Sequence, residues 1–197
     1  MTTNIQTIPK EIWGPKAWHM LHLFSIYPEE EISKKEKHYY YIFYKSFRSI
    51  IPCQICKIHY ESMIEYLEPL EESKISRKYI KRWVWKIHNR VNIRIGKKEI
   101  DYKKAMKIQE RNMNHQDIFF FMNQVFKQLN STKCSMYDFD QIYHFFYTFA
   151  KLYPQPKIRS ILKKLIQTDE FENIQTPCEL KNWYLKHMND WQSHLMS

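Results

Sequence analysis

The chain has 197 residues, of which 44% are hydrophobic and 16% aromatic, so it can bury a substantial core and is not expected to be disordered. Only two glycines occur, which argues against glycine-rich phosphate loops and dinucleotide-binding βαβ folds, and no apolar run is long enough to span a membrane. The formal net charge of +10 is concentrated in residues 74–111, whose 14 basic and 3 acidic side chains should attract an anion, although a solvated basic helix face would explain some of them.

Apolar residues recur at three- and four-residue intervals through the first half of the chain, which predicts a series of helices. Pro15 is expected near the first turn of the first helix, where its missing N–H costs nothing. Pro28 ends that helix, and Gly96 stands where a left-handed C-cap belongs. The predicted helices cover residues 12–27, 33–50, 53–67 and 76–95, with a short polar helix or a linker at residues 101–111.

The second half also reads as helices, and no segment shows a convincing strand pattern. The predicted fold class is therefore all-α. We expect a first domain over residues 1–104, a linker over 105–114 and a helical C-terminal domain over 115–197. The helices of the second half are expected at residues 115–130, 138–153, 156–168 and 178–194.

The sharpest local motif is Pro52-Cys53-Gln54-Ile55-Cys56. Pro52 would start a helix at this point, and the helix N-terminus favours thiolate over thiol, while the two-residue gap lets the sulfurs form a reversible disulfide. Zinc is the main competing interpretation, because His59 could add a third ligand, but no second motif supplies a fourth. A thioredoxin-like site would need a βαβ pattern, which is absent.

A second motif lies in the basic segment. His88 and Asn92 are four residues apart and share a helix face, with Asn89 close by. Their hydrogen-bonding edges beside tryptophan and valine suit a flat heteroaromatic ring, and Lys97 with its basic neighbours could take a pyrophosphate. A helix with a satisfied, buried histidine and a solvated basic face explains this segment equally well when it is taken alone.

The first helix carries a third motif, in which Trp13-Gly14-Pro15 is followed by Trp18 and His22. Ordinary helix packing would account for it alone. Together, however, the three motifs resemble the Erv/ALR family of FAD-linked sulfhydryl oxidases, which shows W-G-x-x-x-W-x-x-x-H, P-C-x-x-C and H-N-x-V-N-x-x-x-x-K in this order. The resemblance covers about residues 10–104, and the composition is similar to members encoded by large DNA viruses.

The resemblance implies a four-helix bundle plus a short fifth helix that binds FAD, usually in a homodimer. It makes Cys56 the flavin-proximal sulfur and Cys53 the sulfur that meets protein dithiol substrates, with oxygen reduced to hydrogen peroxide. The residues that match cofactor-binding positions are Gly14, Pro15, Trp18, His22, Tyr60, His88, Asn89, Val91, Asn92 and Lys97. No metal ligand is implied.

Two features depart from the family pattern. Trp85 and Tyr102 stand where members often have a structural disulfide, so a packed contact between the two rings is expected in its place. Members often also carry a second, shuttle C-x-x-C, and none occurs in this chain. Substrate thiols would then reach Cys53 directly, or a partner would supply the shuttle.

The second half contains no motif of its own, but its Tyr153-Pro154 and Pro177-Cys178 repeat the spacing of Tyr27-Pro28 and Pro52-Cys53 within one residue. We interpret this as a degenerate repeat of the oxidase bundle, with chance similarity as the alternative. Such a repeat could act as a built-in dimer partner, enlarge a dimer interface or bind substrate. The remaining cysteines, at positions 134 and 178, are either bridged or two ordinary buried thiols, and the second is slightly favoured.

The leading hypothesis for function is an FAD-dependent thiol oxidase. The alternative is a non-enzymatic helical module that binds zinc or nucleic acid through the C-x-x-C motif and the basic segment. Because residues 1–13 lack the charged start and apolar stretch of a secretory signal, a cytoplasmic protein is expected, in the host cytoplasm or the virion if it is viral.

Overall fold

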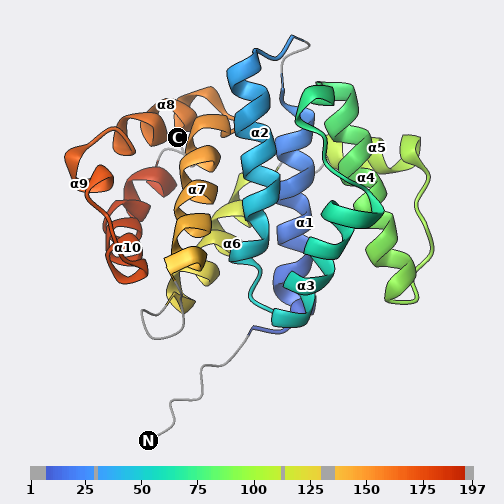
Figure 1. The fold of residues 1–197 in the computed structure, drawn as a ribbon, viewed down its shortest axis with the longest axis horizontal. Helices are drawn as coiled ribbons and strands as arrows, with labels where there is room; N and C mark the ends of the chain where they lie inside the picture. Colours follow the sequence, from blue (N-terminus) through green and yellow to red (C-terminus); the bar gives the residue numbers. More distant parts are fainter. Residues whose placement is uncertain (1–7, 29–30, 112–113, 130–135, 194–197) are drawn as a thin grey trace, which may run out of the picture.

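The computed structural model describes residues 8–28, 31–111, 114–129 and 136–193, and these residues form helices and connecting turns without a strand (Figure 1). The all-α fold class is therefore confirmed. No helix in these ranges is long and apolar enough to cross a bilayer.

The first half forms a bundle of four helices and a fifth one, α5. Its elements are α1 (Lys10–Ile26), α2 (Lys34–Ser46), the 3₁₀ turn η1 (Phe47–Ile50), α3 (Gln54–Ser62), the π-helical turn η2 (Met63–Leu67), the 3₁₀ turn η3 (Glu72–Lys74), α4 (Arg77–Arg94) and α5 (Tyr102–Arg111). Polar N-caps begin several of them: the Ser33 hydroxyl accepts the backbone N–H of Glu36, whose carboxylate accepts the N–H of Ser33 in return.

The second half adds helices on the other side of α1 and α2. Its elements are α6 (His115–Gln128), α7 (Met136–Leu152), α8 (Pro156–Leu165), α9 (Asp169–Glu172) and α10 (Pro177–Ser193). In Figure 1, α1 and α2 stand in the centre, with α4 and α5 on one side and α7 to α10 on the other. The pair α2–α7 makes the most extensive contact between helices, and α1 packs against both α4 and α6.

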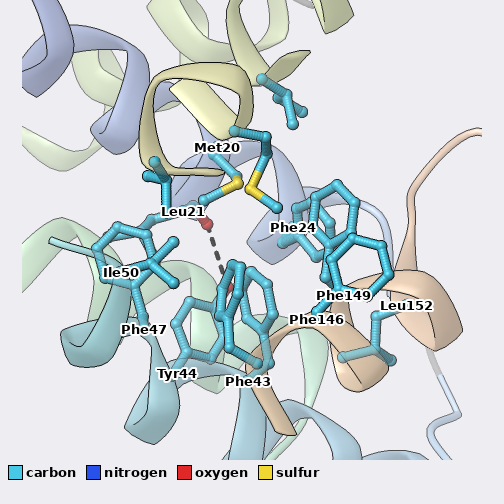
Figure 2. Packing of buried hydrophobic residues seen from close by; sticks show 14 of the residues in the cluster. Met20, Leu21, Phe24, Phe43, Tyr44, Phe47, Ile50, Phe146, Phe149 and Leu152 are labelled. Atoms are coloured by element: carbon cyan, nitrogen blue, oxygen red, sulfur yellow. Dashed lines mark hydrogen bonds between the residues drawn. The ribbon is translucent and has the colours of Figure 1, made fainter. Parts of the chain in front are cut away.

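Aromatic side chains fill the contact between the two halves (Figure 2). The Phe24 ring stacks on Phe43 with 4.4 Å between centroids and lies 5.4 Å from Phe149 of α7. Phe43 in turn lies 5.3 Å from Phe145. Beside these rings the Tyr44 hydroxyl donates to the Leu21 carbonyl oxygen at 3.1 Å. The buried core is therefore continuous from α1 to α10.

Several boundaries differ from the sequence prediction. Helix α1 begins at Lys10 rather than residue 12, because the Pro9 carbonyl already accepts the N–H of Ile12 at 2.9 Å, so Pro15 lies beyond the first turn. The sequence did not predict the short α9. Thr168 caps its start, because the Thr168 hydroxyl accepts the backbone N–H of Phe171. Gly96 has φ +75°, as predicted for a left-handed C-cap.

The positions of the helices do not test the predicted division into two domains joined by a linker at residues 105–114. Residues 105–111, assigned to a linker, lie in α5, and Ala105 and Met106 are buried. The helix ends of the two halves correspond, since Tyr27 and Tyr153 follow α1 and α7 directly, while Pro52-Cys53 and Pro177-Cys178 lie at the starts of α3 and α10. The degenerate repeat remains a prediction.

Candidate functional site

The Cys53–Cys56 pair lies at the N-terminus of α3, where the motif places it, and the two sulfurs form a disulfide. Cys53 is the N-cap, with extended backbone at φ −150°, and its Sγ accepts the N–H of Cys56 at 3.3 Å. Both residues are half-buried. When the bond is reduced, a thiolate on Cys53 would face the unpaired N–H groups and positive dipole end of the helix, which stabilise it.

Helices α1 and α4 bring Trp18, His22 and His88 together, although the sequence separates them by up to 70 positions. His22 Nε2 lies 2.9 Å from His88 Nδ1, which is a hydrogen bond between the two imidazoles. The Trp18 ring stacks on the His88 ring with 4.2 Å between centroids and 2° between planes. The His22 ring is tilted by 47° to both of the others, and the three side chains together form one aromatic surface with polar edges.

Both imidazoles of this surface are held neutral. Burial, followed by the neighbouring His88, lowers the pKa of His22 to about 3, and His22 is 1% exposed. Burial, followed by the charge of Lys97, lowers the pKa of His88 to about 4. His22 Nδ1 is buried and has no hydrogen-bond partner among the described residues. This unpartnered ring nitrogen is a candidate hydrogen-bonding group for a ligand.

The two asparagines of α4 have different surroundings. The Asn89 amide donates to the Ile100 carbonyl at 2.9 Å and accepts the Ile100 N–H at 3.1 Å, so Asn89 holds the loop after α4 in place. Asn92 is buried, and its side-chain amide nitrogen makes a long contact of 3.5 Å with Asn89 Oδ1. The backbone carbonyl oxygen of Asn92 accepts the backbone N–H of Lys97 at 2.8 Å, and this bond closes the C-cap of α4.

The other sequence-predicted cofactor residues surround these side chains at different depths. Tyr60 is buried, and its hydroxyl donates to the Tyr44 carbonyl at 2.8 Å, so only its ring is free for other contacts. Val91 is half-buried against the core, and Lys97 is exposed just after α4. Gly14 and Pro15 lie on α1, and a Cβ added at Gly14 would meet no atom within 4 Å.

The predicted contact in place of the family's structural disulfide is present. The Trp85 and Tyr102 rings meet edge to face with 5.5 Å between centroids. Trp85 Nε1 also donates to the Ile100 carbonyl at 2.7 Å, and the Arg82 guanidinium lies 5.5 Å from the Tyr102 ring centroid. Together with Asn89, these contacts join α4 to the start of α5.

His59 was considered in the sequence only as a zinc ligand, and the structure gives it another contact. Its Nε2 forms a hydrogen bond with the Arg94 guanidinium, which ties α3 to the end of α4. Burial, followed by the Arg94 charge, lowers the pKa of His59. Within the described ranges no group of three or more His, Cys, Asp or Glu side chains could hold a metal ion. The hydrogen bond between His59 and Arg94 joins two helices, and a periodic pattern within one helix cannot reveal it.

Of the two cysteines of the second half, Cys178 is exposed and unpaired, so the interpretation of it as a buried thiol is wrong. It lies in the first turn of α10, where its Sγ is 3.9 Å from the Asn182 amide nitrogen. Cys134 lies outside the described residues.

Comparison with known proteins identifies the family. The model of the Erv1 / Alr family matches residues 15–113, which contain the disulfide and the Trp18–His22–His88 surface. The chain belongs to the Erv1/Alr family. "Probable FAD-linked sulfhydryl oxidase" of Acanthamoeba polyphaga mimivirus is 30% identical over 103 residues, covering 52% of this chain and 72% of that protein.

Two African swine fever virus proteins, from the isolates Pig/Kenya/KEN-50/1950 and Tick/Malawi/Lil 20-1/1983, are each named "FAD-linked sulfhydryl oxidase". Each is 31% identical over 101 residues, covering 51% of this chain and 82% of the relative. No solved structure matches the chain. The family match ends before α6, so helices α6 to α10 lie outside the matched region.

Proposed function

We propose that the chain is an FAD-dependent thiol oxidase that forms disulfides in protein substrates and reduces oxygen to hydrogen peroxide. The observation that carries the proposal is the Cys53–Cys56 disulfide at the N-terminus of α3, in the same bundle as the neutral histidine pair and the stacked Trp18. The family match and the names of the viral relatives support the same activity.

The residues of the bundle fit FAD. Trp18 and His88 offer a flat face for a ring system, and the unpartnered Nδ1 of buried His22 offers a hydrogen-bonding group at its edge. Lys97 and the basic side chains of residues 74–111 supply positive charge for a pyrophosphate. Trp18, His22, His88, Asn92 and Lys97 would hold the cofactor, with Asn89 and Tyr60 acting through the backbone groups they bind.

The disulfide supplies the first half of the chemistry. A substrate thiolate attacks Sγ of Cys53, the Cys53–Cys56 bond breaks, and Cys56 leaves as a thiolate. A second substrate thiolate then attacks the substrate sulfur of the mixed disulfide and releases Cys53 as a thiolate that accepts the Cys56 N–H. Two substrate thiols thereby lose two protons and two electrons, and the cysteine pair gains the electrons. FAD, when bound, takes these two electrons from the pair and passes them to oxygen.

The partners of the site are thus protein thiols and oxygen. A homodimer, which the resemblance predicts, would need an interface other than the faces of α1 and α2 that α6 and α7 cover. The alternative of a zinc-binding module is not favoured, because sulfurs in a disulfide are not available as thiolate ligands. A cytoplasmic location stays a prediction.

Oxygen consumption with dithiothreitol tests the proposal. The purified, flavin-loaded protein should consume oxygen, and Cys56→Ser should slow it by at least about a hundredfold, because electrons can no longer leave through a disulfide. Cys178→Ser is the matched control, since Cys178 is exposed and on another helix, and its rate should equal that of the wild type. Equal rates in wild type and Cys56→Ser, or no uptake by the flavin-loaded wild type, would refute the proposal.

A further inference from the structure

A groove with a cavity volume of about 300 Å³ lies where α3 meets α6 and α7. The first half contributes Pro52, Gln54 and Ile58 to its wall, and the second half contributes Val125, Gln128 and Ile142. None of the three side chains of the Trp18–His22–His88 surface lines it. Its volume is at the lower end for small-molecule pockets, so it suits one or two side chains rather than a large cofactor.

The groove adjoins the reactive disulfide. Pro52 and Gln54, the residues directly before and after Cys53, both line it. Gln54, Ile58 and Glu61 are spaced four and three residues apart, so one face of α3 forms a wall that runs away from Cys53. A substrate cysteine that reaches Cys53 Sγ therefore brings its neighbouring residues to the mouth of this groove.

The lining suits an uncharged, extended peptide. Its charged groups are already engaged: Arg48 pairs with Glu61, Lys57 Nζ donates to the Ser49 carbonyl at 3.1 Å, and Asp138 also has a partner. The groove offers polar and apolar surface together: Ile58, which is 55% exposed, supplies an apolar side chain, and Gln54 and Gln128 supply side-chain amides. Such amides can both donate to and accept from a peptide backbone.

We propose that this groove binds the residues that flank the reacting cysteine of a protein substrate, with an apolar side chain seated between α3 and the second half. The inference rests on the proposed thiol oxidase function and adds a role for the second half: α6 and α7 form one side of the substrate site. The chain carries no second C-x-x-C to deliver electrons, so direct docking of the substrate next to Cys53 supplies the approach.

Two synthetic peptide dithiols test the groove with the flavin-loaded full chain. Both carry the same pair of cysteines, flanked by leucines in one and by serines in the other, and dithiothreitol serves as the small dithiol. The wild type should oxidise the leucine peptide with a kcat/KM about tenfold higher than the serine peptide, because burying leucine side chains favours binding by that order.

Two variants locate the effect. Ile58→Asp should reduce the preference to less than about twofold, whereas Ile108→Asp on α5, another exposed isoleucine, should leave it intact. Gln128→Arg, which fills the groove from α6, should also remove the preference, and Gln116→Arg at the exposed start of the same helix should not. Neither Ile58 nor Gln128 is buried, so the variants should fold, which their thermal melting would show.

The outcomes are distinct. Equal kcat/KM for the two peptides in a wild type that oxidises dithiothreitol would refute substrate binding in the groove, while the proposed thiol oxidase function would remain supported. If Gln128→Arg still prefers the leucine peptide, the proposal that α6 and α7 form one side of the substrate site would be refuted. A flavin-loaded wild type that cannot oxidise dithiothreitol would refute the proposed function and this inference with it.

Discussion

Phe149 of α7 joins the two halves of the chain, and Phe149→Ala should therefore destabilise both together. Its ring is fully buried, 5.4 Å from Phe24 of α1 and 5.3 Å from Tyr153. Truncating a buried phenylalanine to alanine leaves a cavity and costs about 3–5 kcal/mol. For a protein of this size the melting temperature should fall by roughly 6–20 °C, at about 2–4 °C per kcal/mol.

Urea unfolding followed by circular dichroism gives the change in free energy, and hydrogen exchange of peptides from each half shows where it acts. Peptides from α1 and α4 should lose protection at the same lowered urea concentration as peptides from α7 and α10, because one continuous core connects them. Phe120→Ala is the control: the same substitution at a side chain that is 36% exposed should cost about 1 kcal/mol or less.

Early loss of protection in the helices of the second half, with α1 and α4 keeping the wild-type midpoint, would contradict a single cooperative core. The two halves would then be independent domains, as the sequence prediction of a boundary near residues 105–114 implies.

Three further predictions concern the first half. Asn89→Leu should cost about 1–3 kcal/mol, because it leaves the backbone N–H of Ile100 without its partner, whereas the Ile100 carbonyl keeps Trp85 Nε1; a change in the urea midpoint worth less than about 0.5 kcal/mol would contradict this. The lowered pKa values of His22 and His88, about 3 and about 4 against an ordinary 6.5, mean that the unfolded chain binds more protons than the folded one in acid. The free energy of unfolding should thus have its full value above about pH 6.5 and fall as the pH drops toward 4, and the fall should be shallower in His88→Gln; urea unfolding curves that do not change with pH would contradict this prediction. Gly14→Ala, in a helix with room for a Cβ, should raise stability by about 0.5–1 kcal/mol, whereas Gly96→Ala should lower it by about 1 kcal/mol because φ is +75°; thermal melts with the same sign for both would disprove the assignment.

The helices could be predicted from the sequence because their signals are local. Apolar periodicity located every long helix, and Pro28 and Gly96 marked ends that the structure also has. The same holds for the redox pair, since a helix N-terminus after Pro52 follows from two adjacent residues. The short α9 was missed because four residues are too few to show a period.

Contacts between distant segments could not be predicted in this way. The spacing showed that Asn89 and Asn92 lie near one face of α4. It did not show that the backbone of Ile100 binds the side-chain amide of Asn89 and does not bind that of Asn92. Likewise, the periodicity predicted a helix over residues 33–50, yet a helical period does not say which other helix covers its apolar face. That α7 does so depends on how the two halves pack, as does the groove beside Cys53.

The measurement that tests the central claim most directly is the visible absorption spectrum of the purified protein under anaerobic conditions, before and after dithiothreitol and then after air. The account predicts a flavin band near the usual 450 nm region that dithiothreitol bleaches and air restores, and that dithiothreitol fails to bleach in Cys56→Ser. A protein without the band, or a bound flavin that dithiothreitol bleaches equally in Cys56→Ser, would contradict a thiol oxidase that works through the Cys53–Cys56 pair.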